Sequence, residues 1–264
     1  MKQINLDGSP LHFVQDDRLQ FNVTEHRYKV EGLGELTPVS RVISSFFKPF
    51  DAEYWSLRKC GHDEEQAAQL RDKWNLKGAI ASQTGTYLHK QIENFIHTKE
   101  TPDMKCRTVY DGEFIHQEED VDISKEWSFF RKFDRETEYH PFRTEWGIYD
   151  ETSRIAGTID LICSCEDGEY EIYDWKRSNK VDPGEANYWS SGINGLEHLY
   201  DTSYVHYCLQ QNLYRYIVEK NYGLKIKRMN LVILHPDFED YRIVPIPKLD
   251  REVDIILKAF PQTF

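Results

Sequence analysis

Apolar residues recur along this chain with two different spacings. A return at every third or fourth position predicts amphipathic helices, and alternation with polar residues predicts strands. Helices are expected at 41–60 (broken around Pro49), 63–78, 82–100, 123–140, 204–223 and 250–260. Strands are expected as one or two hairpins within 11–40, and then at 143–150, 154–164, 170–177, 227–236 and 241–246. The polar segment 100–120 predicts a loop or a weak strand. Pro141 is expected to end the helix at 123–140.

This order of elements predicts an α/β fold with a mixed central sheet. No repeat, low-complexity tract or linker divides the chain. We therefore expect a single domain over 1–264, with an N-terminal hairpin and helical extension at 1–77 and a core at 78–264.

The net charge of −12 argues against a protein that coats nucleic acid nonspecifically, because such binding needs clustered Lys and Arg. A local basic groove or a carboxylate site for a metal remains compatible with it. The five cysteines are scattered without a CxxC pair, so Cys163 and Cys165 are expected to be small core or edge residues. No apolar run approaches membrane-spanning length, which predicts an intracellular, cytoplasmic protein without membrane contacts.

The segment "RIAGTIDLICSCEDGEYEIYDWK" predicts two strands joined by a tight turn. A two-residue turn at 167–168 would place Asp160 opposite Trp175. A three-residue loop at 166–168, with its glycine left-handed, would place Asp160 opposite Asp174. We favour the second register because it brings Asp160, Asp174 and Lys176 to one face. It also avoids setting two glutamates directly against each other, which is destabilising.

In that register Asp160, Asp174 and Lys176 share one face of the sheet. Two adjacent carboxylates repel unless a positive charge lies between them, and Mg²⁺ is bound by such oxygen ligands. The alternative is a surface Asp–Lys ion pair, which is the commoner meaning of a D-x-K triplet on its own.

Other polar pairs have helical spacing. His89 and Glu93 lie four residues apart, as do Gln210 and Tyr214, and Glu145 begins a strand. Each has an ordinary explanation when it is considered alone.

Taken together and in this order, these residues resemble the PD-(D/E)XK nuclease superfamily. The similarity is to the branch of RecB-type nuclease domains, CRISPR-associated RecB-like exonucleases and the mitochondrial genome-maintenance exonuclease, and it covers about 78–235. The segment "ELTPVSRVISSFFKPFD" is similar to phage and large-DNA-virus nucleases. The family's Pro-Asp is Ile159-Asp160 here. The resemblance implies a restriction-endonuclease-like αβββαβ core.

The resemblance also implies one or two Mg²⁺ or Mn²⁺ ions. No iron–sulfur cluster is expected, because no cysteine follows Cys208. Glu145 would bind a second metal or orient water. The implied metal ligands are His89, Asp160, Asp174 and the Trp175 backbone carbonyl; the implied catalytic residues are Lys176, Asp174, Asp160 and Glu145; and residues expected at the nucleic acid are Gln210, Tyr214, Glu93, Arg177, Arg131 and Lys132.

The helix around Arg131 and Lys132 interleaves these charges with Phe129, Phe130 and Phe133. It could stack single-stranded bases, or, as is commoner, bury its aromatics and solvate its charges.

The expected function is a metal-dependent deoxyribonuclease, most simply an exonuclease at single-stranded or frayed DNA ends. One alternative is an RNA endonuclease of the cap-snatching type, and another is a non-catalytic nucleic-acid-binding module of the same fold. DNA is the expected partner, with replication or recombination proteins as further candidates, and the compartment would be the host cytoplasm if the source is a virus or phage.

Overall fold

The computed structural model describes residues 4–22, 25 and 27–260, which form two compact units. Unit 1 comprises Met1–Lys48, Thr137–Ile233 and Arg242–Phe264, and unit 2 comprises Pro49–Glu136 and Leu234–Tyr241. The boundary expected at 77/78 falls within a helix of unit 2.

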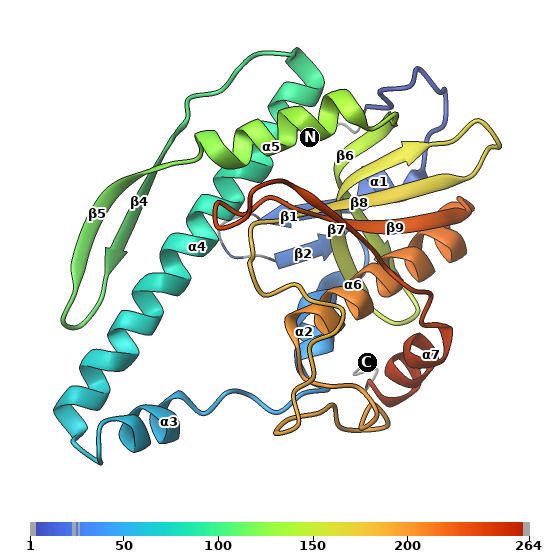
Figure 1. Ribbon diagram of the computed structural model, residues 1–264. Coiled ribbons are helices and arrows are strands. Elements are labelled where there is room, and N and C mark those ends of the chain that lie inside the picture. Colours follow the sequence, from blue (N-terminus) through green and yellow to red (C-terminus); the bar gives the residue numbers. More distant parts are fainter. Residues whose placement is uncertain (1–3, 23–24, 26, 261–264) are drawn as a thin grey trace. The chain divides into compact units, whose positions relative to one another are not determined.

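Unit 1 is built on a mixed sheet with strand order β1-β2-β3-β7-β8-β9-β10, and β6 pairs with β7 outside this path. The β3–β7 and β8–β9 pairs are parallel and the other pairs are antiparallel. The expected mixed α/β fold is therefore confirmed (Figure 1). The strands are β1 (Leu19–Asn22), β2 (Arg27–Val30), β3 (Gly34–Pro38), β6 (His140–Asp150), β7 (Ile155–Ser164), β8 (Tyr170–Lys176), β9 (Ile226–Ile233) and β10 (Arg242–Pro245).

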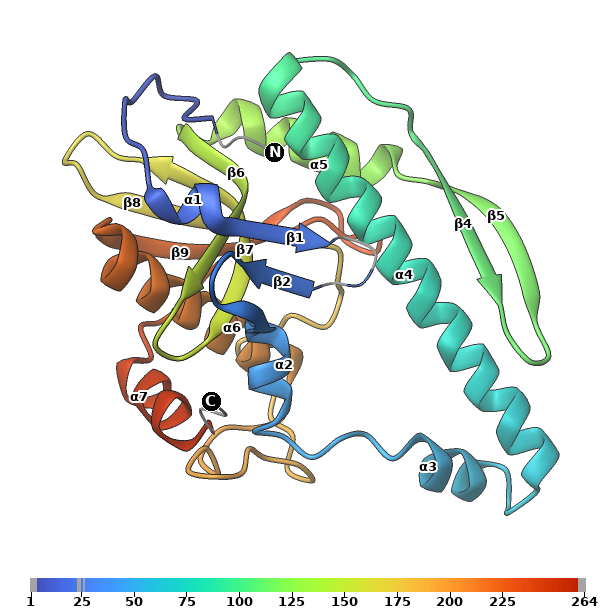
Figure 2. The same ribbon diagram turned by 180° about the vertical axis from the view of Figure 1, so that it is seen from behind.

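Helix α6 (Ser203–Ile217) packs against β6 and against two further helices of unit 1, α2 (Val39–Ser44) and α7 (Asp250–Ala259) (Figures 1 and 2). The Thr202 side chain caps its first turn by accepting the Val205 N–H at 3.3 Å. The helix continues as a π-helical turn, η1 (Val218–Tyr222), and ends at Gly223, whose φ of 68° is the left-handed conformation that glycine favours. A short helix, α1 (Val14–Arg18), precedes β1.

Unit 2 contains α3 (Ala52–Lys59), α4 (Glu64–Thr98), the hairpin β4 (Lys105–Asp111) and β5 (His116–Asp122), and α5 (Ser124–Glu136). The sequence prediction of a helix end at Gly78 is wrong, because α4 runs through it. An interior glycine costs a helix only about 1 kcal/mol and no proline follows it here. The hairpin occupies the segment expected to be loop or weak strand. Helix α5 ends before Pro141, which lies in β6.

The hairpin of unit 2 is fastened to α4 through Asp72. One carboxylate oxygen of Asp72 accepts the N–H groups of Phe114 and Ile115, each at 2.8 Å, and the other accepts the Tyr110 hydroxyl. Phe129, Phe130 and Phe133 of α5 are buried. The alternative prediction, that these rings form a base-stacking surface, is therefore wrong, because they are part of the core of unit 2.

Within the described residues, no helix has the length and apolar character needed to traverse a lipid bilayer.

Candidate active site

The β7–β8 hairpin adopts the three-residue loop that the sequence analysis favoured. The Cys165 N–H donates to the Glu169 carbonyl at 2.9 Å, and Gly168, with a φ of 77°, donates to the Cys165 carbonyl at 3.0 Å. The ladder then pairs Leu161 with Tyr173. Continuing this register by one residue places Asp160 opposite Asp174, so the predicted register is confirmed.

The two strands part at these aspartates. The β7–β8 ladder has its last pair at Leu161 and Tyr173, whereas β8 stays paired with β9 as far as Lys176. Beyond the last β7–β8 pair, the Trp175 N–H donates to the Asp160 carboxylate at 2.9 Å instead of to a β7 carbonyl. The separation therefore leaves the Trp175 N–H to a side-chain acceptor. It places the Asp160 carboxylate beside the backbone of the "DWK" segment.

Asp174 is held from two directions and is 2% exposed. Gln211 of α6 donates its Nε2 to Asp174 Oδ1 at 2.8 Å, and Lys176 forms an ion pair with Oδ2. The ammonium of Lys176 also lies 4.7 Å from the ring centroid of Tyr207, another α6 residue. Strand β8 and helix α6 therefore position this carboxylate together.

Lys176 is mostly buried, and its pKa reflects opposing causes. Burial lowers the pKa of Lys176, but the negative charges of Asp174 and Asp160 outweigh it and raise the pKa above its usual value. The ion pair that the simplest explanation of "DWK" predicted is thus present, but inside the protein and not on its surface.

Glu145 stands in β6 with a φ of 43°, the left-handed region that non-glycine residues rarely adopt. It lies between the ladder pairs Thr144–Leu161 and Trp146–Ile159, hence opposite Asp160. Carboxylate oxygens of Glu145 and Asp160 lie within 4.8 Å of each other. Strained residues of this kind occur at functional sites, where surrounding structure holds them.

Tyr214 of α6 is buried against β7. A Cβ atom added to Gly157 would lie 2.3 Å from the Tyr214 ring, so only glycine lets α6 approach β7 this closely. Gln210 donates to the Tyr214 hydroxyl at 2.9 Å, and burial raises the pKa of that hydroxyl. The Gln210–Tyr214 pair predicted from the sequence exists, and its ring serves packing. Contact of this pair with nucleic acid stays a prediction.

The sequence pattern indicated Gln210 as a site residue and did not indicate its neighbour Gln211. Tyr207 and Gln211 lie four residues apart on α6 and contact Lys176 and Asp174, respectively. A spacing of four residues places both side chains on one face of a helix, and this was the feature of the sequence that could have identified them.

Several of the remaining predicted residues make contacts that are common on protein surfaces. Glu93 forms an ion pair with Lys90 at 2.7 Å on α4, the helix that also carries His89. Lys132 pairs with Asp240, and the Arg131 guanidinium lies 4.1 Å from the Phe95 ring centroid. All of these belong to unit 2. In unit 1, Arg177 follows β8 directly and is half-buried.

The donor set of unit 1 fits a hard divalent cation. Glu145 and Asp160 supply neighbouring carboxylate oxygens, the ligands that Mg²⁺ and Mn²⁺ prefer, whereas Gln211 and Lys176 already contact the oxygens of Asp174. Beside Asp174, the buried Oε1 of Gln211 has no hydrogen-bond partner among the described residues. A buried acceptor of this kind suits an ordered water molecule.

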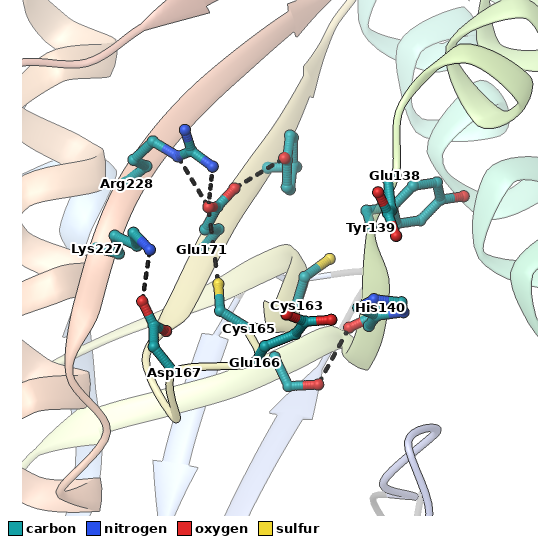
Figure 3. Close-up of a pocket in the computed structure, with 12 residues that line it drawn as sticks. Glu138, Tyr139, His140, Cys163, Cys165, Glu166, Asp167, Glu171, Lys227 and Arg228 are labelled. Atoms are coloured by element: carbon teal, nitrogen blue, oxygen red, sulfur yellow. Dashed lines mark hydrogen bonds and ion pairs between the residues drawn. The ribbon is translucent and has the colours of Figure 1, made fainter.

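A separate pocket of about 380 Å³ lies at the turn end of the β7–β8 hairpin and contains none of the predicted site residues (Figure 3). Its wall includes Glu171, which accepts the Tyr173 hydroxyl at 2.9 Å and Arg228 Nε at 2.8 Å. Burial raises the pKa of the Cys163 thiol well above its usual value, so this cysteine stays protonated.

No family model matches this sequence, and no curated protein matches it significantly. Among solved structures, the crystal structure of SSO0001 is similar over 50% of this chain and 53% of its own, with 15% sequence identity. The chain therefore spans about half of that protein, and the TM-score of 0.26 is too low to support an argument about fold or function.

Proposed function

We propose that the chain is a metal-dependent nuclease that hydrolyses phosphodiester bonds in DNA, with Asp160, Asp174 and Lys176 at its centre. The observation that carries this proposal is the parting of β7 and β8 at two opposed aspartates, one of which is paired with Lys176. The motif resemblance of the sequence agrees with it.

Each side chain has a distinct task in this proposal. Asp160, Asp174 and Glu145 would hold Mg²⁺ or Mn²⁺, together with the Trp175 carbonyl. The bound cation would supply Lewis-acid polarisation of the phosphate and acidification of a water molecule. Lys176, an ammonium that cannot bind a cation, would offset charge developing on the phosphate or orient the attacking water. Gln211 keeps the Asp174 carboxylate in place.

His89 belongs to unit 2, and the resemblance assigns it to this metal. His89→Ala should then weaken Mn²⁺-induced thermal stabilisation without abolishing it, whereas His97→Ala on the same helix should leave it unchanged. An equal Mn²⁺ shift in wild type and His89→Ala would remove His89 from the site and leave the carboxylates.

The deciding experiment is digestion of end-labelled single-stranded DNA, duplex DNA and RNA, alongside a closed circle, with Mg²⁺, Mn²⁺ or EDTA. We expect metal-dependent loss of the linear DNA substrates and persistence of the circle, because an end-processing enzyme needs a free terminus. Nicking of the circle at a comparable rate would replace the exonuclease by an endonuclease, and preferential RNA cleavage would favour the cap-snatching alternative. Absence of cleavage with every metal and substrate would leave a non-catalytic module.

A further inference from the structure

Unit 2 carries an exposed group of aromatic rings that the proposed chemistry does not use. Phe50, Tyr54 and Trp55 are 67%, 51% and 40% exposed. Large aromatic side chains gathered in solvent are characteristic of binding surfaces, because burial in a core would otherwise stabilise them. We define the α3 aromatic surface as Phe50, Tyr54, Trp55, Arg58, Lys59 and Trp74.

The rings are arranged in edge-to-face pairs. The centroids of Tyr54 and Trp55 lie 5.3 Å apart at 80°, and those of Phe50 and Trp74 lie 5.8 Å apart at 61°. Such geometry is favourable between aromatic rings and limits their rotation. The rings are therefore partly preorganised before any ligand arrives.

The backbone beneath the rings is anchored as well. Asp51 caps α3 by accepting the Tyr54 N–H at 2.8 Å, and the buried Ser56 accepts a hydrogen bond from Arg71 of α4 at 2.8 Å. A ligand would consequently meet a fixed helix, which lowers the conformational entropy lost on binding.

Positive charges accompany these rings. The Arg58 guanidinium lies 5.4 Å from the Trp55 ring centroid and donates to the Tyr54 hydroxyl at 3.3 Å. Lys59 Nζ lies 5.5 Å from the Trp74 ring centroid. The acids of this helix, Asp51 at its cap and Glu53, lie at its N-terminal end, so the positive charge is concentrated in the last turn.

We propose that the α3 aromatic surface binds single-stranded nucleic acid, with unpaired bases stacking on its rings and phosphates contacting Arg58 and Lys59. Aromatic side chains beside cations provide both interactions that sequence-tolerant single-strand binding uses. A duplex stacks its own bases and hides their faces, so it should gain little from these rings. The inference rests on the proposed function for the choice of nucleic acid as ligand, but it does not require cleavage.

The test is fluorescence anisotropy of the full chain with a labelled oligothymidylate in EDTA, so that binding is measured without hydrolysis. Tyr54→Ala/Trp55→Ala should weaken binding about tenfold or more, the scale of one lost base stack. Tyr54→Phe/Trp55→Phe should bind nearly as wild type, because it retains the rings. Arg58→Ala should reduce the slope of log K against log salt by about 0.7.

Phe114→Ala provides a matched control. Phe114 is also an exposed aromatic of unit 2, at 42%, but it lies in the β4–β5 turn among the exposed acids Asp111 and Glu113. Its removal should leave oligothymidylate binding unchanged. A duplex of equal length should bind the alanine double variant and the wild type equally.

The inference is overturned if the alanine double variant binds oligothymidylate as tightly as wild type, or if wild type shows no binding. An equal loss in the phenylalanine variant would also overturn it, because the rings would then not be the cause. Loss of binding confined to the alanine variant supports it even if no metal produces cleavage. Cleavage accompanied by unchanged binding of the alanine variant would support the nuclease and reject this surface.

Discussion

The backbone N–H of Trp175 donates to the Asp160 carboxylate at 2.9 Å, across the gap where β7 and β8 separate. This bond ties the strand that carries Asp174 and Lys176 to the strand that carries Asp160. A hydrogen bond to a charged acceptor is stronger than one between neutral groups, so it orients the Asp160 carboxylate where the strands separate. The candidate site therefore depends on the register of one hairpin.

Asp160→Asn and Asp174→Asn should separate metal binding from folding. Each should lose Mn²⁺-induced thermal stabilisation, which is about 2.7 kcal/mol at a metal concentration of 100 times Kd. Asp160→Asn should otherwise be near wild type, because the amide oxygen can still accept the Trp175 N–H. Differential scanning fluorimetry with and without Mn²⁺ measures this, and a full shift in either variant would exclude that residue as a ligand.

Asp174→Asn should behave differently in the absence of metal. Relief of repulsion between the two acids alone would predict a neutral or stabilising change. In the structure, however, Asp174 pairs with the mostly buried Lys176. Its neutralisation should destabilise the metal-free protein by about 2 kcal/mol.

Gln211→Leu should reduce both metal affinity and turnover, because the hydrogen bond that orients Asp174 is lost. We expect about a tenfold fall in activity and a loss of stability of about 1 kcal/mol, lessened because the buried unpaired Oε1 is also removed. For metal affinity, Gln210→Leu is the control, since Gln210 bonds to Tyr214 and not to Asp174. Manganese titrations followed by fluorimetry would refute this role of Gln211 if the two variants behaved alike.

The register of the β7–β8 hairpin could be predicted because local chemistry decides it. A left-handed glycine in a three-residue loop and the repulsion of facing glutamates both lie within a few residues of the turn. The continuity of α4 was harder to predict, because Gly78 is a weak helix breaker and the hairpin that covers α4 is distant in sequence.

The backbone conformation of Glu145 and the hydrogen bond of Gln211 could not be predicted from the sequence. A positive φ at a glutamate has no signature in composition or periodicity, because neighbouring strands impose it. Gln211 bonds to a residue 37 positions away, so its role depends on how α6 packs on the sheet. The clash that any side chain at Gly157 would make with Tyr214 arises in the same way.

The positive φ of Glu145 should lower the stability of the fold, whereas its carboxylate should support activity. Glu145→Asn and Glu145→Gln both remove the carboxylate, but only asparagine readily adopts the left-handed φ of this position. Both should lose activity, and Glu145→Asn should be more stable than Glu145→Gln by up to about 1 kcal/mol in urea unfolding. Equal stabilities would mean that the backbone here carries no strain.

Gly157→Ala should destabilise unit 1 by about 1–3 kcal/mol, because its Cβ would overlap the Tyr214 ring. Tyr214→Phe keeps the ring and should not relieve the overlap, whereas Tyr214→Ala should. In a double-mutant cycle measured by urea unfolding, Gly157→Ala should therefore cost less in the Tyr214→Ala background than in wild type. Additive effects would contradict this packing.

Lys176→Ala removes the positive charge from the centre of the candidate site. Without metal, the buried Asp174 loses its ion-pair partner, so the free energy of unfolding should fall by about 2–3 kcal/mol. With Mn²⁺ the thermal shift should be at least as large as in wild type, because the cation no longer competes with an ammonium for the Asp174 carboxylate.

Turnover of Lys176→Ala should nevertheless fall by about 10²-fold or more, the scale seen when a charge-stabilising group is removed from a transition state. Lys176→Arg should restore stability better than activity, since a guanidinium keeps the charge but differs in shape and position. Fluorimetry and single-turnover cleavage of end-labelled DNA separate these effects. Near-normal cleavage by the alanine variant, once it is folded with Mn²⁺, would reduce the Asp174–Lys176 pair to a buried structural ion pair.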